Sequence, residues 1–224
     1  MRGHPQGWPQ LFLIHLKTFV YIDGFNLFYG ALKKTPYKWL DVAKLCRLLL
    51  PNHQVLQIRY FTAIVHARRH DPGAPTRQQF YLRALRTIPN LSIHLGQFRS
   101  HAVPMPLATS TAVPPKTATV IKTEEKGSDV NLATFLLLDG FRNSYDTAVL
   151  ITNDSDLLAP IRVIRSEFKK KVGLLNPQRS KSVALDLLPH LDFYRPIRKG
   201  VLGASHFPPS MHDAAGAFHK PSGW

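Results

Sequence analysis

The sequence predicts an α/β fold: a three-layer, doubly wound and mainly parallel sheet with helices on both faces. Short apolar runs of strand length alternate along the chain with segments of helical length. Several of these runs are nearly continuously apolar, which is typical of strands that are buried on both faces of a parallel sheet. With 224 residues, of which 44% are hydrophobic, the chain is long enough to form one substantial core.

Six apolar runs have the length and composition of strands. They comprise residues 18–23, 55–65, 91–98, 147–152, 171–176 and 191–195. Six segments between or after them have the length and pattern of helices. These comprise residues 26–33, 41–50, 76–87, 128–142, 156–169 and 180–188. In a sheet built this way ligands bind beyond the carboxyl ends of the strands, so the residues that end each strand are of most interest.

Three segments fall outside the alternation. Residues 1–16 contain prolines and glycines and are expected to be a flexible lead-in to a domain that spans residues 17–198. Residues 199–224 are rich in Gly, Pro, Ser and His without any period, so we expect a disordered tail. Residues 99–126 are too rich in proline for a helix, and they are expected to form either a protruding two-stranded arm or a mobile loop.

The charge of the chain indicates a polyanionic partner. Lysine and arginine number 29 against 14 for aspartate and glutamate, a formal net charge of +15. Nucleic acid gains affinity for such a protein by releasing counterions, whereas a membrane surface or an acidic protein would use the same charge less specifically. Charge alone does not choose among these three, and it leaves open a homodimer or a regulatory protein partner.

The remaining composition favours a cytoplasmic protein. The lone cysteine, Cys46, lies in an apolar helical run, so we expect a core residue and no disulfide within the chain. The N-terminal run LFLIHL falls far short of the ~20 apolar residues that span a bilayer. The histidines are scattered, without the spacing of a zinc site.

Carboxylates follow two of the predicted strands. Asp23 ends the first strand, and Asp154 and Asp156 follow the run 147–152, while Asp129 lies in the first turn of the helix 128–142. Asp156 and Asp129 also have simpler explanations, as a helix cap and as a partner of the helix dipole. Acids that converge raise one another's pKa, and a divalent cation removes that cost. Oxygen ligands without nearby His or Cys favour Mg²⁺ or Mn²⁺.

Three blocks of the sequence resemble the signatures of NYN domains, ribonucleases with a PIN-like fold. They read YIDGFNLFYG, EEKGSDVNLATFLL and VLITNDSDLLAPIRVI, and the resemblance covers roughly residues 17–195. It implies an acidic Mg²⁺ or Mn²⁺ site, supporting polar residues beside it, and cleavage of RNA by a water that attacks the phosphorus. The implied metal ligands and catalytic residues are Asp23, Asp129, Asp154 and Asp156, with Asn26, Asn153 and Ser155 in support. Thr152-Asn153 stands where the family commonly has Ser-Gly, which bears on specificity more than on activity.

Substrate contacts are expected from residues near the same edge of the sheet. Lys126 and Ser128 precede or begin the helix 128–142, and Arg68 and Arg69 follow the second strand. Lys126 has an alternative explanation, as an exposed lysine that pairs with neighbouring acids. The leading hypothesis is a Mg²⁺- or Mn²⁺-dependent ribonuclease, an endonuclease acting on single-stranded or loop RNA. The alternative is a non-catalytic RNA-binding or adaptor module on the same fold.

Overall fold

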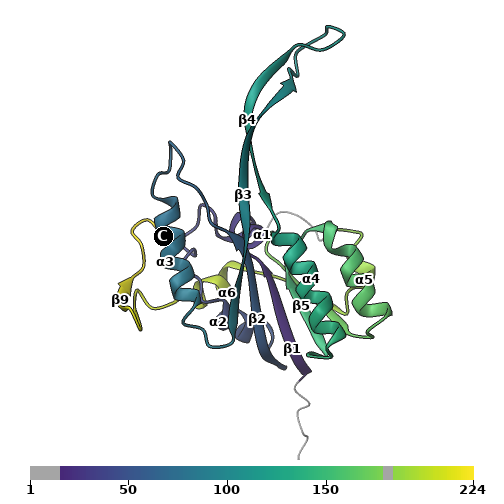
Figure 1. Ribbon diagram of the computed structural model, residues 1–224. Coiled ribbons are helices and arrows are strands. Elements are labelled where there is room, and N and C mark those ends of the chain that lie inside the picture. Colours follow the sequence, from purple (N-terminus) through teal and green to yellow (C-terminus); the bar gives the residue numbers. More distant parts are fainter. Residues whose placement is uncertain (1–15, 179–183) are drawn as a thin grey trace, which may run out of the picture.

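The computed structural model, which describes residues 16–178 and 184–224, has a seven-stranded sheet. The sheet lies at the centre of the molecule (Figure 1). The strand order is β4-β3-β2-β1-β5-β6-β7, and every neighbouring pair is parallel except β3 with β4. The strands are β1 (Leu16–Asp23), β2 (His53–Ala63), β3 (Leu91–Pro106), β4 (Thr117–Lys126), β5 (Thr147–Ile151), β6 (Lys171–Asn176) and β7 (Phe193–Pro196). This order confirms the predicted doubly wound, mainly parallel sheet.

Helices cover both faces of the sheet, which completes the three predicted layers. They are α1 (Gly24–Leu27), continued by the π-helical turn η1 (Phe28–Leu32), α2 (Val42–Leu49), α3 (Ala74–Leu85), α4 (Ser128–Phe141), the 3₁₀ turn η2 (Ser155–Leu157), α5 (Leu158–Ser166), the 3₁₀ turn η3 (Leu188–His190) and α6 (Lys199–Ala204). Side chains of a strand alternate between the faces. Val20 and Ile22 therefore pack on the side of α2 and α3, whereas Tyr21 packs beneath α4 and α5.

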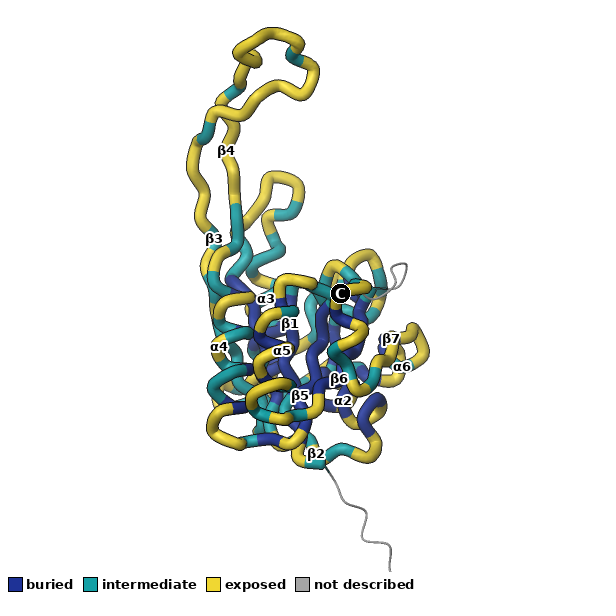
Figure 2. Tube along the Cα trace, turned by 90° about the vertical axis from the view of Figure 1, so that its right-hand side faces the viewer, coloured by how far each residue is buried: buried dark blue, intermediate teal, exposed yellow. Residues whose placement is uncertain are grey.

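The segment 99–126 is a two-stranded arm and not a loop. Strands β3 and β4 pair in antiparallel register from Gln97 opposite Lys126 to Pro106 opposite Thr117. Only the first part of β3, Leu91 to Gly96, pairs with β2, so the rest leaves the sheet and rises beyond it (Figure 1). Figure 2 shows that nearly all of the projecting part is exposed. Of the two expected alternatives, an arm or a loop, the structure therefore has the arm.

The structure differs from the expectation of a disordered tail. Residues 199–224 form α6, β8 (Ser210–Asp213) and β9 (Gly216–His219). Phe207 and Phe218 are 6% and 2% exposed in the core on the α2 and α3 side, and Arg83 donates two hydrogen bonds to the Asp213 carboxylate, at 2.7 and 2.8 Å. A few isolated aromatic anchors are enough to hold a segment against an existing surface, and they leave no period in the sequence.

Two other expectations concern segments that lie wholly or partly outside the described residues, 1–16 and 180–188. The lead-in lies almost wholly outside the described residues, which begin at residue 16. The expected helix over 180–188 lies partly outside them, and its described part, from residue 184, forms turns followed by η3 rather than a helix. In the described ranges, no helix combines the length and the apolar character needed to cross a membrane.

Candidate metal centre

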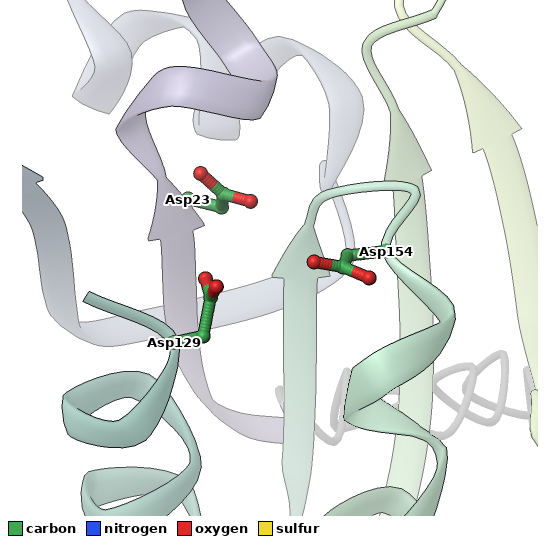
Figure 3. Close-up of side chains that lie close together, drawn as sticks. All are labelled: Asp23, Asp129 and Asp154. Atoms are coloured by element: carbon green, nitrogen blue, oxygen red, sulfur yellow. The ribbon is translucent and has the colours of Figure 1, made fainter. Parts of the chain in front are cut away.

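Three carboxylates converge at the carboxyl edge of the sheet. Asp23, Asp129 and Asp154 each place an oxygen atom so that all three oxygens lie within 4.8 Å of one another. Asp23 ends β1, Asp129 lies in the first turn of α4, and Asp154 follows β5 (Figure 3). The two strands are neighbours in the sheet, so acids far apart in the sequence reach one point.

Asp23 is held in a fixed orientation by two hydrogen bonds. Its Oδ1 accepts the backbone N–H of Asn26 at 2.9 Å, and its Oδ2 accepts the Thr152 hydroxyl at 3.2 Å. The chain turns into α1 directly after it, at Gly24, where a Cβ atom would lie 2.7 Å from the Phe61 carbonyl oxygen. Glycine is therefore required at this position, because the backbone passes so close to β2. The pair Asp23-Gly24 directs a carboxylate into the cleft and turns the chain away from it.

Thr152 links two of the acids, a role that the sequence analysis did not assign to it. Its buried hydroxyl donates to Asp23 and accepts the backbone N–H of Asp154 at 3.2 Å. The Asp154 Oδ1 atom in turn accepts the N–H of Asp156 at 3.0 Å. The signal that could have shown this role is a hydroxyl residue that ends a continuously apolar strand, because a buried hydroxyl needs partners.

Asp129 is positioned by the base of the arm. Gly127, between β4 and α4, has a φ of 101°, a conformation that favours glycine, and the Ser128 N–H and hydroxyl both donate to Glu125 Oε1, at 3.2 and 2.8 Å. At Gly96 of β3 a Cβ atom would lie 2.7 Å from the Lys126 carbonyl oxygen. The close approach of these two backbones fixes where α4 begins, and with it the direction of the Asp129 side chain.

The electrostatics of the cluster favour binding of a cation. The pKa of Asp23 is raised to about 6, chiefly by burial and also by the charges of Asp129 and Asp154, while the hydrogen bonds from Asn26 and Thr152 partly oppose the rise. Burial likewise raises the pKa of Asp129, as do the charges of Asp154 and two other acids nearby. Three mutually repelling oxygen donors suit a divalent ion with oxygen ligands, such as Mg²⁺ or Mn²⁺. The donor set therefore fits the predicted metal.

The raised pKa of Asp23 predicts a pH-dependent stability of the metal-free protein. Asp23 holds its proton up to about pH 6 in the folded state, against about 3.8 when unfolded. Stability from this group is therefore full below about pH 4 and is lost as pH rises towards 6, by about 3 kcal/mol in all. We expect Asp23→Asn to stabilise the protein in EDTA at pH 8 by up to that amount, and by about 1 kcal/mol at pH 4.5.

Urea unfolding of the wild type and of Asp23→Asn at the two pH values measures this effect. Groups that titrate alike in both proteins cancel when the two free energies of unfolding are subtracted at each pH. An equal loss of stability at both pH values would contradict the prediction, because the bonds that the Asp23 carboxylate makes would then outweigh the cost of burying its charge.

The carboxylates line a cleft of about 610 Å³. Its wall also contains Asn26, Ser128 and Arg68, and among its described lining residues Arg68 is the one lysine or arginine. The Asn26 side-chain oxygen accepts the backbone N–H of Asn153 at 3.2 Å, which joins the loops after β1 and β5. Asn26, Ser128 and Arg68 thus line the cleft, and the roles of these residues stay predictions.

Four other predicted residues lie at or outside the rim. Asp156 is exposed and stands outside the three-way cluster, although its charge contributes to the raised pKa of Asp129. Ser155 is exposed in η2, and Arg69 is exposed and is not part of the cleft lining. The Lys126 ammonium lies 3.6 Å from a carboxylate oxygen of Glu124, which agrees with the alternative explanation of an exposed, paired lysine.

Comparisons with known proteins agree with this architecture. The family model of the NYN domain matches residues 17–187. The chain is 31% identical over 220 residues to 6-hydroxy-3-succinoylpyridine 3-monooxygenase HspA of Pseudomonas putida, a match that covers 86% of this chain and 70% of the relative. It also resembles the crystal structure of a protein of unknown function from Vibrio parahaemolyticus, with a TM-score of 0.53, 16% identity, and coverage of 83% of this chain and 94% of that one. The chain belongs to the NYN domain family.

Proposed function

We propose that the protein is a Mg²⁺- or Mn²⁺-dependent ribonuclease that hydrolyses phosphodiester bonds in single-stranded or loop RNA. The observation that carries the proposal is the convergence of Asp23, Asp129 and Asp154 in one cleft of a chain whose net charge is +15. An acidic centre in a basic protein suits a polyanionic substrate whose reacting phosphate is approached through a cation. Membership of the NYN family supports the same substrate class.

Different residues of the cleft would hold the metal and support its ligands. Asp23, Asp129 and Asp154 would hold the metal, and Asp156 at the rim would complete its shell or help to hold a second ion. A divalent ion bound there lowers the pKa of the attacking water and offsets the negative charge that develops on the phosphate. Thr152 keeps two of the carboxylates in place through its hydroxyl. Supporting groups of this kind commonly change metal affinity or activity by about 10–100-fold.

Substrate contacts are proposed for residues on both sides of the acids. Arg68 lines the cleft and offers a cation to a phosphate, and Ser128 and Asn26 offer polar groups beside the metal. The other proposed contacts stand at the rim or on the loops that surround the cleft: Lys126, Asn153, Ser155 and Arg69. An exposed arginine or lysine can turn towards a bound strand without disturbing the fold.

The name of the Pseudomonas relative denotes a different reaction, a monooxygenation of 6-hydroxy-3-succinoylpyridine. Three carboxylate oxygens within 4.8 Å of one another favour phosphodiester hydrolysis over that reaction. Hard oxygen donors select Mg²⁺ or Mn²⁺, ions whose usual contribution is charge stabilisation at a phosphate.

A cleavage assay tests the proposal. We expect the purified protein to cut a short labelled single-stranded RNA in Mn²⁺ or Mg²⁺, to stop in EDTA, and to resume when the ion is restored. Cleavage that continues in EDTA would rule out the metal mechanism. Salt-sensitive binding of RNA without any cleavage, unaffected by the metal, would instead support the non-catalytic binding module.

A further inference from the structure

A second cavity lies beside the acidic cleft. It has a volume of about 410 Å³, within the range that holds a small ligand, and it shares Phe25, Tyr29 and Arg68 with the cleft. The two spaces therefore meet along the helical segment that follows Asp23. A strand whose phosphate lies at the carboxylates can continue directly into this second cavity.

The second cavity has the opposite charge to the cleft. Among the described residues, five lysines and arginines line it against one acid, Asp71, and that acid already pairs with Arg77. The five are Lys33, Lys34, Lys38, Arg68 and Arg77. His66 and His70 add two further nitrogen donors. Such a lining attracts a ligand that carries negative charge.

The cavity also offers aromatic rings. Tyr29 is 53% exposed, and the Lys33 ammonium lies 4.6 Å from the centre of its ring. Phe25 and Phe28 also line the cavity. An accessible ring with a cation beside it matches a ligand that combines a flat ring with an anionic group, because base–aromatic stacking contributes ~1–3 kcal/mol for each base.

The C-terminal segment forms part of the cavity wall through Ser222, Gly223 and Trp224. The Trp224 ring packs against Trp39 and Tyr81, with ring centres 6.4 and 5.5 Å apart, and the Lys38 ammonium donates to the Gly223 carbonyl at 2.9 Å. Packed elements of the folded domain therefore form the cavity walls: η1, α3 and the segment that carries Trp224.

We propose that this second cavity binds one nucleotide of the RNA strand, the nucleotide next to the phosphate that lies at the carboxylates. Its base would lie against Tyr29, and its own phosphate would face Lys33 and Lys34. One nucleotide carries both a flat aromatic base and an anionic phosphate, so it matches the ring and the lysines of this cavity. This proposal rests on the proposed ribonuclease activity, because the RNA strand that would enter the cavity is the substrate of that activity.

Abasic substitution tests the base contact. Five-nucleotide uridine strands, each lacking the base at one position, are titrated into the full-length protein in EDTA, which prevents metal-dependent cleavage. At one position we expect the missing base to lower affinity by about 5–100-fold in the wild type and to have little further effect in Tyr29→Ala. If the loss is the same in both proteins at every position, the proposal is wrong. Tyr194→Ala, on β7 and 38% exposed, is the matched control.

A charge substitution tests the phosphate contact. Lys34→Met and Lys169→Met remove the same charge from exposed positions with nearly the same backbone, φ 59° and 54°, but Lys169 precedes β6 and lies at the opposite end of the sheet. We expect Lys34→Met to reduce the slope of log affinity against log salt by about 0.7, and Lys169→Met to leave it unchanged. Equal effects of the two substitutions would mean that Lys34 contributes only non-specific electrostatic attraction, and the proposed phosphate contact would be wrong.

The two proposals fail separately. Cleavage measured in parallel with Mn²⁺ reports the ribonuclease activity, whereas the binding titrations report the nucleotide cavity. Loss of the Tyr29 coupling with cleavage intact would overturn only the cavity. Absence of cleavage with the coupling intact would overturn only the ribonuclease, and would leave a nucleotide-reading binding module.

Discussion

Asp23→Asn is expected to reduce RNA cleavage by a factor of ~10³ or more, because the loss of one ligand weakens both metal binding and the several kcal/mol of charge stabilisation that the metal supplies. Asn keeps the size of the side chain and an oxygen that can accept the Asn26 N–H, so the fold should be unaffected. Asp23 is only 7% exposed, which limits how far water could replace the lost oxygen. Initial rates with saturating Mn²⁺ measure the effect.

Two further variants are expected to lose less activity than Asp23→Asn. Thr152→Val keeps all three carboxylates but removes the hydroxyl that contacts Asp23 and Asp154, and we expect a loss of ~10–100-fold, partly recovered at high Mn²⁺. Asp156→Asn changes an exposed acid outside the three-way cluster, so its effect should be the smallest. Equal losses in all three variants would show that the cluster does not act as one metal site.

Metal binding itself gives a readout that needs no substrate. Mn²⁺ at 100 times its dissociation constant raises the free energy of unfolding by about 2.7 kcal/mol. We expect a rise in melting temperature for the wild type on adding Mn²⁺, and almost none for Asp23→Asn. An identical rise in both proteins would place the ion elsewhere on the molecule.

The sequence was most informative where chemistry and strand order coincide. Asp23 and Asp154 each follow a continuously apolar strand, and parallel strands end at one edge, so their meeting could be predicted without coordinates. Asp129 could be added because the helix after the arm begins at the same edge. The arm was half predicted, since its alternating pattern indicated strands but its proline content allowed a loop.

The features that escaped prediction depend on contacts between residues far apart in the chain. Thr152 contacts Asp23 across 129 positions, and a hydroxyl at the end of a strand does not name its partner. The sequence predicts a disordered tail because the order of this segment depends on Phe207 and Phe218, two anchors that leave no period in the sequence. The basic cavity combines η1, α3 and the segment around Trp224, so only the folded chain brings its charges together.

A buried ion pair beneath α4 is a further case that no local pattern indicates. Arg59 of β2 donates two hydrogen bonds to the Asp139 carboxylate of α4, at 2.6 and 2.8 Å, and the Tyr21 hydroxyl donates to the same carboxylate at 2.8 Å. The Asp139 side chain is 3% exposed and that of Arg59 is 17% exposed. The Arg59 guanidinium also lies 4.7 Å from the centre of the Phe135 ring. This network joins the central sheet to the helix that carries Asp129.

Arg59→Ala is therefore expected to cost about 3–5 kcal/mol of stability, because it leaves the buried Asp139 carboxylate with the Tyr21 hydroxyl as its one remaining side-chain partner among the described residues. Urea unfolding measures the cost. The double variant Arg59→Met/Asp139→Leu, which removes both charges and keeps the volume, should recover most of it. Lys122→Met breaks an exposed pair with Glu124 and should cost no more than about 1 kcal/mol. If Arg59→Ala costs as little as Lys122→Met, Asp139 must find water or another partner, and the link between sheet and α4 is weaker than its geometry indicates.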